Sequence, residues 1–393
     1  MNAPRLVVLA LLVAGGVTPA LAHHRQTPPI IQFTSAGDVS LPRVPSLGRK
    51  IVTFAIPSGS GTQIVTAAPY KDPSILTSIG PAGDNQNPSI SYSGTTVAWD
   101  TDTDPTNSGL PGRQIALARH GTPLQGPADP TGTSANPSLD VGGTRLIFES
   151  TGDLAGTGNA GVRQIFVRSP AGTVTQVSTG LGAATNPVLS PKKHLLVFQS
   201  TSDPVTGLDT GVSQIWMGGL DATQPPVPLT NGLADSTRPS FSDDGAVLTF
   251  ESRANLAGDQ TDMGVPQIFV YHVKSNTFAQ LTREAGGCTT PAVALAKRDW
   301  RVGFVCSGTA YVYMLRTDTW SRLQTNGGDT TAIVPALGVH FYVVATTGDL
   351  ATGGSPTAGH RIYQVNSFKR PLEAVDLGYV AKWFPFRGLP PAK

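Results

Sequence analysis

Short apolar segments separated by polar, glycine-rich turns recur along the chain and predict β-strands rather than helices. The stretch NPSLDVGGTRLIFES (136–150) combines a short strand, a Gly-Gly turn and a second strand rich in apolar and β-branched residues. Close versions of it begin at Asn186 and at Arg238. The sequence lacks the long 3.6-spaced runs of Leu, Ala and Glu that a helical repeat of similar length would need.

A proline marks the start of each repeated unit, and successive prolines stand 44 to 52 residues apart. They are Pro42, Pro88, Pro137, Pro187, Pro239, Pro291 and Pro335. A period of this length with strands inside it is typical of a β-propeller or another repeat array.

Each unit contains the pattern of four strands, and the third begins with a Gln-Ile pair in most units, as in RQIFV at 163–167. The expected fold is therefore all-β: a β-propeller of four-stranded antiparallel blades. Stacking the blades around an axis would cover both apolar faces of each sheet. Seven units predict seven blades, with six as the alternative. Two segments, 30–37 and 372–378, compete to be the outer strand of the blade that closes the ring.

The motif NPS…G…F(E/Q)S…QIFV…LT resembles the TolB-like β-propeller repeats, relatives of the WD-repeat group. The resemblance covers residues 30–378. TolB itself is a periplasmic partner of an envelope-spanning protein complex, with an α/β domain before a six-bladed propeller. Here the first units follow the N-terminal segment within about twenty residues, which leaves no room for that domain, so partnership with such a complex is not carried over.

The N-terminus has the features of a secretory signal peptide: Arg5, an apolar run and the small-x-small sequence Ala20-Leu21-Ala22. The expected organisation is a signal peptide at 1–22, a mobile N-terminus at 23–29, the propeller at 30–378 and a C-terminal tail at 379–393. The mature protein is expected to be exported, periplasmic or secreted, monomeric and without an integral membrane segment. A net charge of +2 without a basic stripe argues against nucleic-acid binding.

Two cysteines, Cys288 and Cys306, are the only ones in the chain. Lys297 lies midway between them, at the expected turn of a hairpin. The two thiols would then lie opposite each other on paired strands, at a separation that a disulfide can bridge. The alternative is a pair of buried thiols that do not meet.

Acidic and amide residues concentrate where the second and third strands of each unit are connected. Asp100, Glu149, Gln199 and Glu251 stand at equivalent ends of the second strands and are predicted to ring the mouth of the channel. The loops that follow add Asp102, Asp104, Asp153, Asp203, Asp209, Asp259, Asp262 and Asp349. Two interpretations stay open: a binding face for a polar ligand, a cation or a basic protein segment, or side chains that satisfy backbone donors in tight loops. Combined substitution of Glu149, Gln199 and Glu251 is expected to leave the fold intact.

No motif in the sequence predicts a cofactor. Asp100, Asp102 and Asp104 resemble the start of a calcium loop, but Pro105 and Pro111 occupy its informative glycine and glutamate positions. Ca²⁺ is therefore a weak expectation, and no metal site is assigned. The seven histidines are scattered over different units. We expect a protein-binding or scaffold module of the cell envelope. The alternative is a glycan lyase or hydrolase, which needs two convergent carboxylates.

Overall fold

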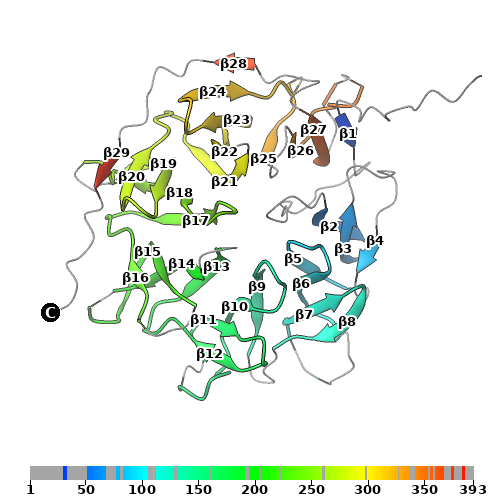
Figure 1. Ribbon diagram of the computed structural model, residues 1–393, viewed down its shortest axis with the longest axis vertical. Coiled ribbons are helices and arrows are strands. Elements are labelled where there is room, and N and C mark those ends of the chain that lie inside the picture. The colour runs from blue at the N-terminus through cyan, green and yellow to red at the C-terminus, as the bar shows by residue number, and fades with distance from the viewer. Residues whose placement is uncertain are drawn as a thin grey trace, which may run out of the picture.

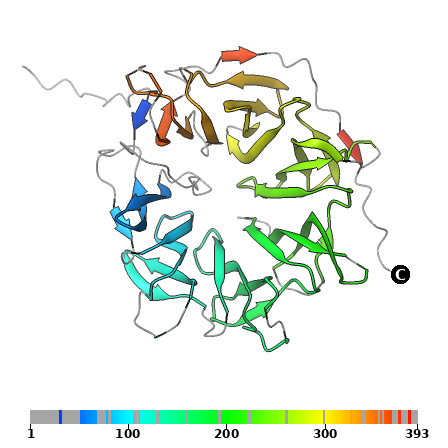
Figure 2. The same cartoon turned by 180° about the vertical axis from the view of Figure 1, so that it is seen from behind.

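Seven antiparallel sheets are arranged around a central axis, and each is one blade of a β-propeller (Figures 1 and 2). The computed structural model describes residues 30–32, 51–67, 77–79, 83–104, 109, 112–127, 132–158, 161–190, 194–203, 205–220, 224–258, 262–296, 299–325, 327–335, 341–352, 355–356, 359–366, 373–375 and 383–385. The expectations for residues 1–29, Pro42 and Asp259 lie outside these residues.

Blades 1 to 4 follow one another along the chain. Blade 1 contains β2 (Val52–Ser58), β3 (Gly61–Ala67) and β4 (Thr77–Ile79); blade 2 contains β5 (Asn85–Ile90), β6 (Thr96–Thr101), β7 (Gln114–Arg119) and β8 (Thr122–Gln125); blade 3 contains β9 (Ser134–Leu139), β10 (Leu146–Ser150), β11 (Gln164–Arg168) and β12 (Val174–Gln176); blade 4 contains β13 (Ala184–Leu189), β14 (Leu195–Ser202), β15 (Asp209–Gly219) and β16 (Val227–Pro228).

The remaining blades use strands from both ends of the chain. Blade 5 contains β17 (Ser236–Phe241), β18 (Val247–Ala254), β19 (Asp262–His272), β20 (Thr277–Gln280) and β29 (Trp383–Pro385); blade 6 contains β21 (Cys288–Ala296), β22 (Asp299–Cys306), β23 (Thr309–Met314), β24 (Thr319–Arg322) and β28 (Glu373–Val375); blade 7 contains β25 (Thr330–Pro335), β26 (Phe341–Thr346), β27 (Arg361–Asn366) and β1 (Ile30–Gln32).

The ring closes through β1, which pairs antiparallel with β27 and becomes the outer strand of blade 7. Of the two competing segments, the N-terminal one therefore occupies this place. Because the free edge of β27 is taken, β28 pairs instead with β24 on blade 6. Further along, β29 pairs with β20 on blade 5, so β28 and β29 are the outermost strands of two neighbouring blades (Figure 1).

Hydrophobic clusters fill the seven junctions between neighbouring blades. In one of them Ala98 and Ile115 of blade 2 pack with Leu139, Phe148 and Phe166 of blade 3. The second strands contribute most, because they are buried on both faces: every residue of β6 and β10 is buried. The core is therefore divided into layers between sheets, which is the reason that sheets with two apolar faces are stable here.

Of the six repeated prolines that the structure describes, five occupy one structural position and Pro335 occupies another. Pro88, Pro137 and the next three prolines are each the fourth residue of an inner strand and follow a residue with positive φ. In β25 the fourth residue is Ile333, and Pro335 stands two residues later. The shorter last spacing in the sequence therefore marks a different position in blade 7, although the number of units is correct.

The described residues contain no helix long and apolar enough to cross a membrane.

Candidate functional site

The four residues predicted at the channel mouth lie buried between neighbouring blades. Their exposed fractions are 0% for Asp100, 4% for Glu149, 6% for Gln199 and 6% for Glu251. We call Asp100, Glu149, Gln199 and Glu251 the junction residues. Each one accepts a hydrogen bond from a backbone N–H on the inner strand of the next blade.

The donors of these bonds are equivalent residues with positive φ. The distances are 3.0 Å from Asn136 N to Asp100 Oδ2, 2.7 Å from Asn186 N to Glu149 Oε2, 2.7 Å from Arg238 N to Gln199 Oε1 and 3.0 Å from Thr290 N to Glu251 Oε2. Every donor precedes a proline and stands at a β-bulge of its own hairpin. Because a bulge releases one backbone group from the strand ladder, its N–H is satisfied by the neighbouring blade.

Arginines contact three of the junction residues from the side. Arg163 pairs with Glu149 at 3.1 Å, Arg238 pairs with Glu251 at 3.1 Å, and Arg113 bridges Asp100 and Asp84. Because these side chains are buried and bonded across junctions, we expect their substitution to weaken the fold, contrary to the expectation from sequence. A ligand role for the junction residues stays a prediction.

The pKa values of Glu149 and of Asp84 are shifted in opposite directions. Burial raises the pKa of Glu149, with a smaller contribution from the like charge of Asp100, against the opposing effects of Asn186, Asn136 and Arg163. For Asp84, burial opposes ionisation, but hydrogen bonds from Gln86 and Thr62 and the Arg113 guanidinium lower the pKa overall. Asp84 and Asp100 thus converge on Arg113, and the surroundings of Asp84 favour its charged form, unlike a general acid.

The loop aspartates that the structure describes organise the turns in which they stand. Asp153 accepts from the N–H groups of Thr157 and Gly158, and Asp203 accepts from those of Val205 and Thr206. The same is true of four more aspartates: Asp104 accepts from Gly109, Asp209 from Gly211, Asp262 from Gly264, and Asp349 from Ala351 and Thr352. Asp102 instead accepts from the N–H of Asp84, 18 residues earlier in the chain. Asp100, Asp102 and Asp104, which resembled a calcium loop, therefore serve different donors. Within the described part of the chain, no three His, Cys, Asp or Glu side chains are grouped to hold a metal ion.

An exposed apolar patch lies over blade 4, on the face that carries the loops between the second and third strands. The sequence patterns did not predict it. We define the apolar patch as Leu181, Val205 and Leu208, whose exposed fractions are 64%, 82% and 56%. Leu181 donates its backbone N–H to the Gly207 carbonyl at 2.7 Å, which holds the connection between blades 3 and 4 against the turn at 205–208. Leu233, 72% exposed, follows on the next connection of that face.

Acidic residues stand in and beside the segments that carry the apolar patch. The segments 179–183 and 205–213 contain no Lys or Arg, Asp209 lies within the second of them and Asp203 just before it. Asp235 accepts a hydrogen bond from the Ser213 N–H at 2.8 Å and is followed three residues later by Arg238. Hydrogen bonds from Thr206 and Val205 lower the pKa of Asp203, and the Thr201 side chain and the Gly211 N–H lower that of Asp209. Both groups therefore stay ionised at neutral pH and give the patch a negative rim.

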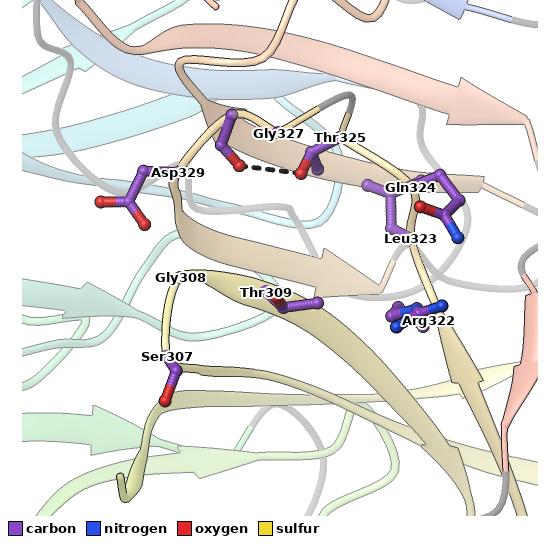
Figure 3. Close-up of a pocket in the computed structure, with 10 residues that line it drawn as sticks. Ser307, Gly308, Thr309, Arg322, Leu323, Gln324, Thr325, Gly327 and Asp329 are labelled. Carbon is purple, nitrogen blue, oxygen red and sulfur yellow. Dashed lines mark hydrogen bonds between the residues drawn. The ribbon is translucent and has the colours of Figure 1, made fainter.

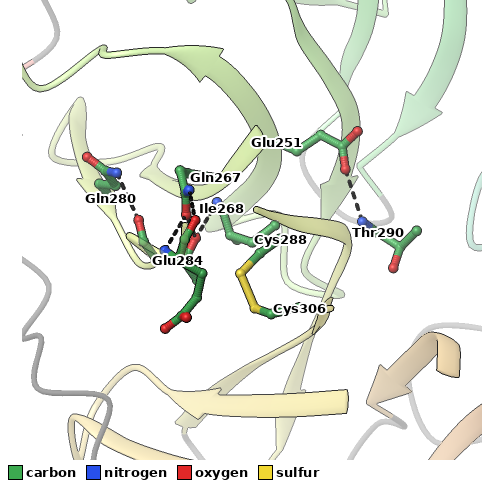
Figure 4. The surroundings of a disulfide bond; sticks show 9 residues. Glu251, Gln267, Ile268, Gln280, Glu284, Cys288, Thr290 and Cys306 are labelled. Carbon is green, nitrogen blue, oxygen red and sulfur yellow. Dashed lines mark hydrogen bonds between the residues drawn. A yellow bond between two sulfur atoms is a disulfide. The ribbon is translucent and has the colours of Figure 1, made fainter. Parts of the chain in front are cut away.

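The disulfide expected from the hairpin is present in blade 6 (Figure 4). Cys288 and Cys306 are directly opposite each other on β21 and β22, with their Cα atoms 4.2 Å apart. The equivalent pair in blade 3 is Ser134 and Ser150, whose hydroxyls are 3.0 Å apart. The disulfide thus stands where another blade uses a hydrogen bond between two serines.

A polar cavity of about 310 Å³ opens on the same face between blades 6 and 7 (Figure 3). It is lined by Ser307, Gly308, Thr309, Arg322, Leu323, Gln324, Thr325, Gly327, Gly328 and Asp329. The turn between β22 and β23 is only two residues long here, whereas the corresponding loop of blade 3 runs from 151 to 163. Blade 1 has an equally short turn between β2 and β3, whereas the other five blades have longer loops between their second and third strands.

No protein-family model and no curated protein sequence matches the chain. Solved structures match it at low identity. A putative TolB from Agrobacterium tumefaciens is 17% identical over 64% of this chain and 87% of its own, with a TM-score of 0.46. The β-propeller domain of the trilobed protease from Pyrococcus furiosus is 8% identical over 87% and 99%, and that of Cps50 (Swd1) from Myceliophteria thermophila is 9% identical over 86% and 99%, both with TM-scores of 0.55. The two likenesses with TM-scores of 0.55 show the β-propeller fold alone, which is the fold expected from the repeat.

Proposed function

We propose that this chain is an exported β-propeller that binds another protein through the face carrying its long loops. The observation that carries the proposal is the apolar patch, because soluble proteins seldom expose several large apolar side chains together without a binding role. Leu181, Val205 and Leu208 come from two different loops held together by a backbone hydrogen bond, so they present one preformed surface.

The charge around the apolar patch defines the chemistry of the partner. Asp203 and Asp209 stand in or beside the segments 179–183 and 205–213, which contain no Lys or Arg. The partner is therefore a protein segment with apolar side chains flanked by Lys or Arg, since complementary charge accelerates and orients association. Export to the cell envelope is proposed from the signal-peptide pattern at residues 1–22.

The test compares the apolar patch with a matched exposed residue elsewhere on blade 4. Tagged mature protein is crosslinked in envelope extracts, in parallel with the variant L181S/V205S/L208S and with Val227→Ser on β16, where Val227 is 52% exposed. We expect the captured protein to decrease at least tenfold for the triple variant, equivalent to about 1.4 kcal/mol, and to be retained by Val227→Ser. Capture should also fall as salt is raised, because the rim is charged.

Equal capture by the triple variant and the parent protein, or no captured protein at all, would overturn this proposal. Circular dichroism of the three proteins shows that loss of capture is not loss of fold. The substitutions are on exposed side chains, so their unfolding temperatures should agree.

A further inference from the structure

Blades 2 to 5 share a side-chain hydrogen bond between the third strand and the connection that leads to the next blade. The first residue of the third strand, or the equivalent position, is a glutamine in all four: Gln114, Gln164, Gln214 and Gln267. Its amide donates to a carbonyl of the connection to the next blade, at 3.0 Å to Gly132 O, 3.0 Å to Gly180 O, 2.8 Å to Gly232 O and 2.7 Å to Glu284 O. We call this carboxamide the glutamine plug.

Hydroxyl groups complete the surroundings of the glutamine plug in two of these blades. Ser178 donates to the carboxamide oxygen of Gln164, and Thr282 donates to that of Gln267 at 2.7 Å. The connection therefore offers a carboxamide both an acceptor for its NH₂ and a donor for its C=O. These are the two requirements of a neutral amide group.

Blade 6 lacks the glutamine plug although its connection, 323–329, has the same length as those of blades 3, 4 and 5. Thr309 pairs with Cys306 as Gln164 pairs with Ser150, so Thr309 occupies the position of the plug. The connections are anchored alike, by Leu323 N to Ala310 O at 3.0 Å and by Val177 N to Ile165 O at 2.8 Å. Gln324 stands where blade 3 has Ser178, and it is exposed.

The polar cavity lies at this position. Thr309 is part of its wall together with the connection residues 322–325 and 327–329, and the two-residue turn Ser307–Gly308 leaves it open (Figure 3). Thr325 uses its hydroxyl to bond the Gly328 carbonyl at 2.8 Å, which keeps the connection in shape without a plug. The volume of about 310 Å³ is at the lower end of the range for small-molecule sites.

We propose that this cavity binds a small molecule bearing a carboxamide group, in the place that the glutamine plug fills in blades 2 to 5. The hydroxyls of Ser307 and Thr309 supply donors and acceptors for an amide. Arg322 and Asp329 bring opposite charges to the wall, so a neutral polar group fits better than an ion. The cavity of blade 6 is separate from the apolar patch over blade 4, so binding of a small molecule in the cavity does not depend on binding of a protein at the patch.

The test uses two carboxamides and their nearest analogues as probes, N-acetylglucosamine against glucosamine and glutamine against glutamate. Saturation-transfer NMR titrations of the full mature chain should show saturable binding of at least one carboxamide, and at least tenfold weaker binding of its analogue. Whether the sugar or the amino acid binds identifies the source of the group. The variant Thr309→Gln places the native plug in the cavity and should weaken binding at least tenfold.

A second variant, Gln324→Trp, covers the opening from an exposed position and decides the outcome if Thr309→Gln does not fold. It too should weaken carboxamide binding at least tenfold, whereas L181S/V205S/L208S should bind like the parent. No saturable binding of either carboxamide, equal binding of the analogues, or unchanged binding in a folded cavity variant would overturn the proposal.

Discussion

Blades 3 and 6 have the same strand order but are held together by different means. Blade 3 bonds to its neighbour through Glu149, pairs Ser134 with Ser150 by a hydrogen bond, and carries the Gln164 plug. Blade 6 has Val305, the disulfide and Thr309 at the equivalent positions. The repeat therefore fixes the backbone, while the polar contacts inside and between blades are exchanged for others.

The junction after blade 6 shows what replaces a junction residue. A side chain on Gly303 would place its Cβ 2.4 Å from the carbonyl oxygen of Ile333 in blade 7, so this glycine allows close backbone approach. Blade 3 has Ile147 at the same position. Arg301 also reaches across the junction, 3.3 Å from the Tyr342 hydroxyl. Close packing thus takes the place of the buried carboxylate there.

Removing the disulfide should have the largest effect on stability. In Cys288→Ser/Cys306→Ser, the loss of a crosslink spanning 18 residues should lower the free energy of unfolding by about 3 kcal/mol. The strands should stay paired, because a serine pair occupies this position in blade 3. Urea unfolding measures the loss, and reduced parent protein should lose the same amount. An unchanged midpoint in both would contradict this role of the disulfide.

Glu149→Ala should have the next largest effect, because it removes the acceptor of the Asn186 N–H and the partner of Arg163. We expect a loss of about 1–2 kcal/mol in the free energy of unfolding. Glu149→Gln is the matched control and should lose less, since Gln199 accepts the same bond in the next blade. Equal stability of the alanine and glutamine variants would show that the junction bond contributes nothing.

The smallest effect concerns pH. Burial raises the pKa of Glu149 above its ordinary value of 4.5. As the pH rises from 4.5 to the raised pKa, the unfolded chain has lost a proton that the folded chain keeps, so this group's stability contribution is progressively lost. Glu149→Gln has no such group, so the difference in the free energy of unfolding between the two proteins should shift in favour of the variant as the pH rises above 4.5. Parallel stability curves would contradict the shift.

The sequence predicted the features that repeat locally and missed those made between blades. The Pro and Gln-Ile patterns predicted the blades, and the hairpin around Lys297 predicted the cysteine pairing, because each depends on residues close in the chain. The role of the junction residues depends on donors 36 to 39 residues away, in the next blade. Their position at strand ends was visible, but their partners were not.

The apolar patch had no periodic signal, since Leu181, Val205 and Leu208 are single apolar residues in turn-rich loops. Hydrogen bonds between the two segments, among them Leu181 N–H to the Gly207 carbonyl, bring them together. The cavity of blade 6 did leave a trace: its third strand, TAYVYM at 309–314, lacks the Gln-Ile pair that the third strands of blades 1 to 5 contain. The absence of a repeated residue pair from one blade can thus indicate a candidate site.

The pairing of β1 with β27 determines the order in which the protein can be completed during synthesis. Ile30 meets Val365, so one of the earliest strands to be made waits more than 300 residues for its partner. Blades 1 to 4 and the first four strands of blades 5 and 6 can form from neighbouring segments in the meantime, but blade 7 requires both ends of the chain. Because such long-range pairings form slowly, ring closure should be the late step in the assembly of this protein.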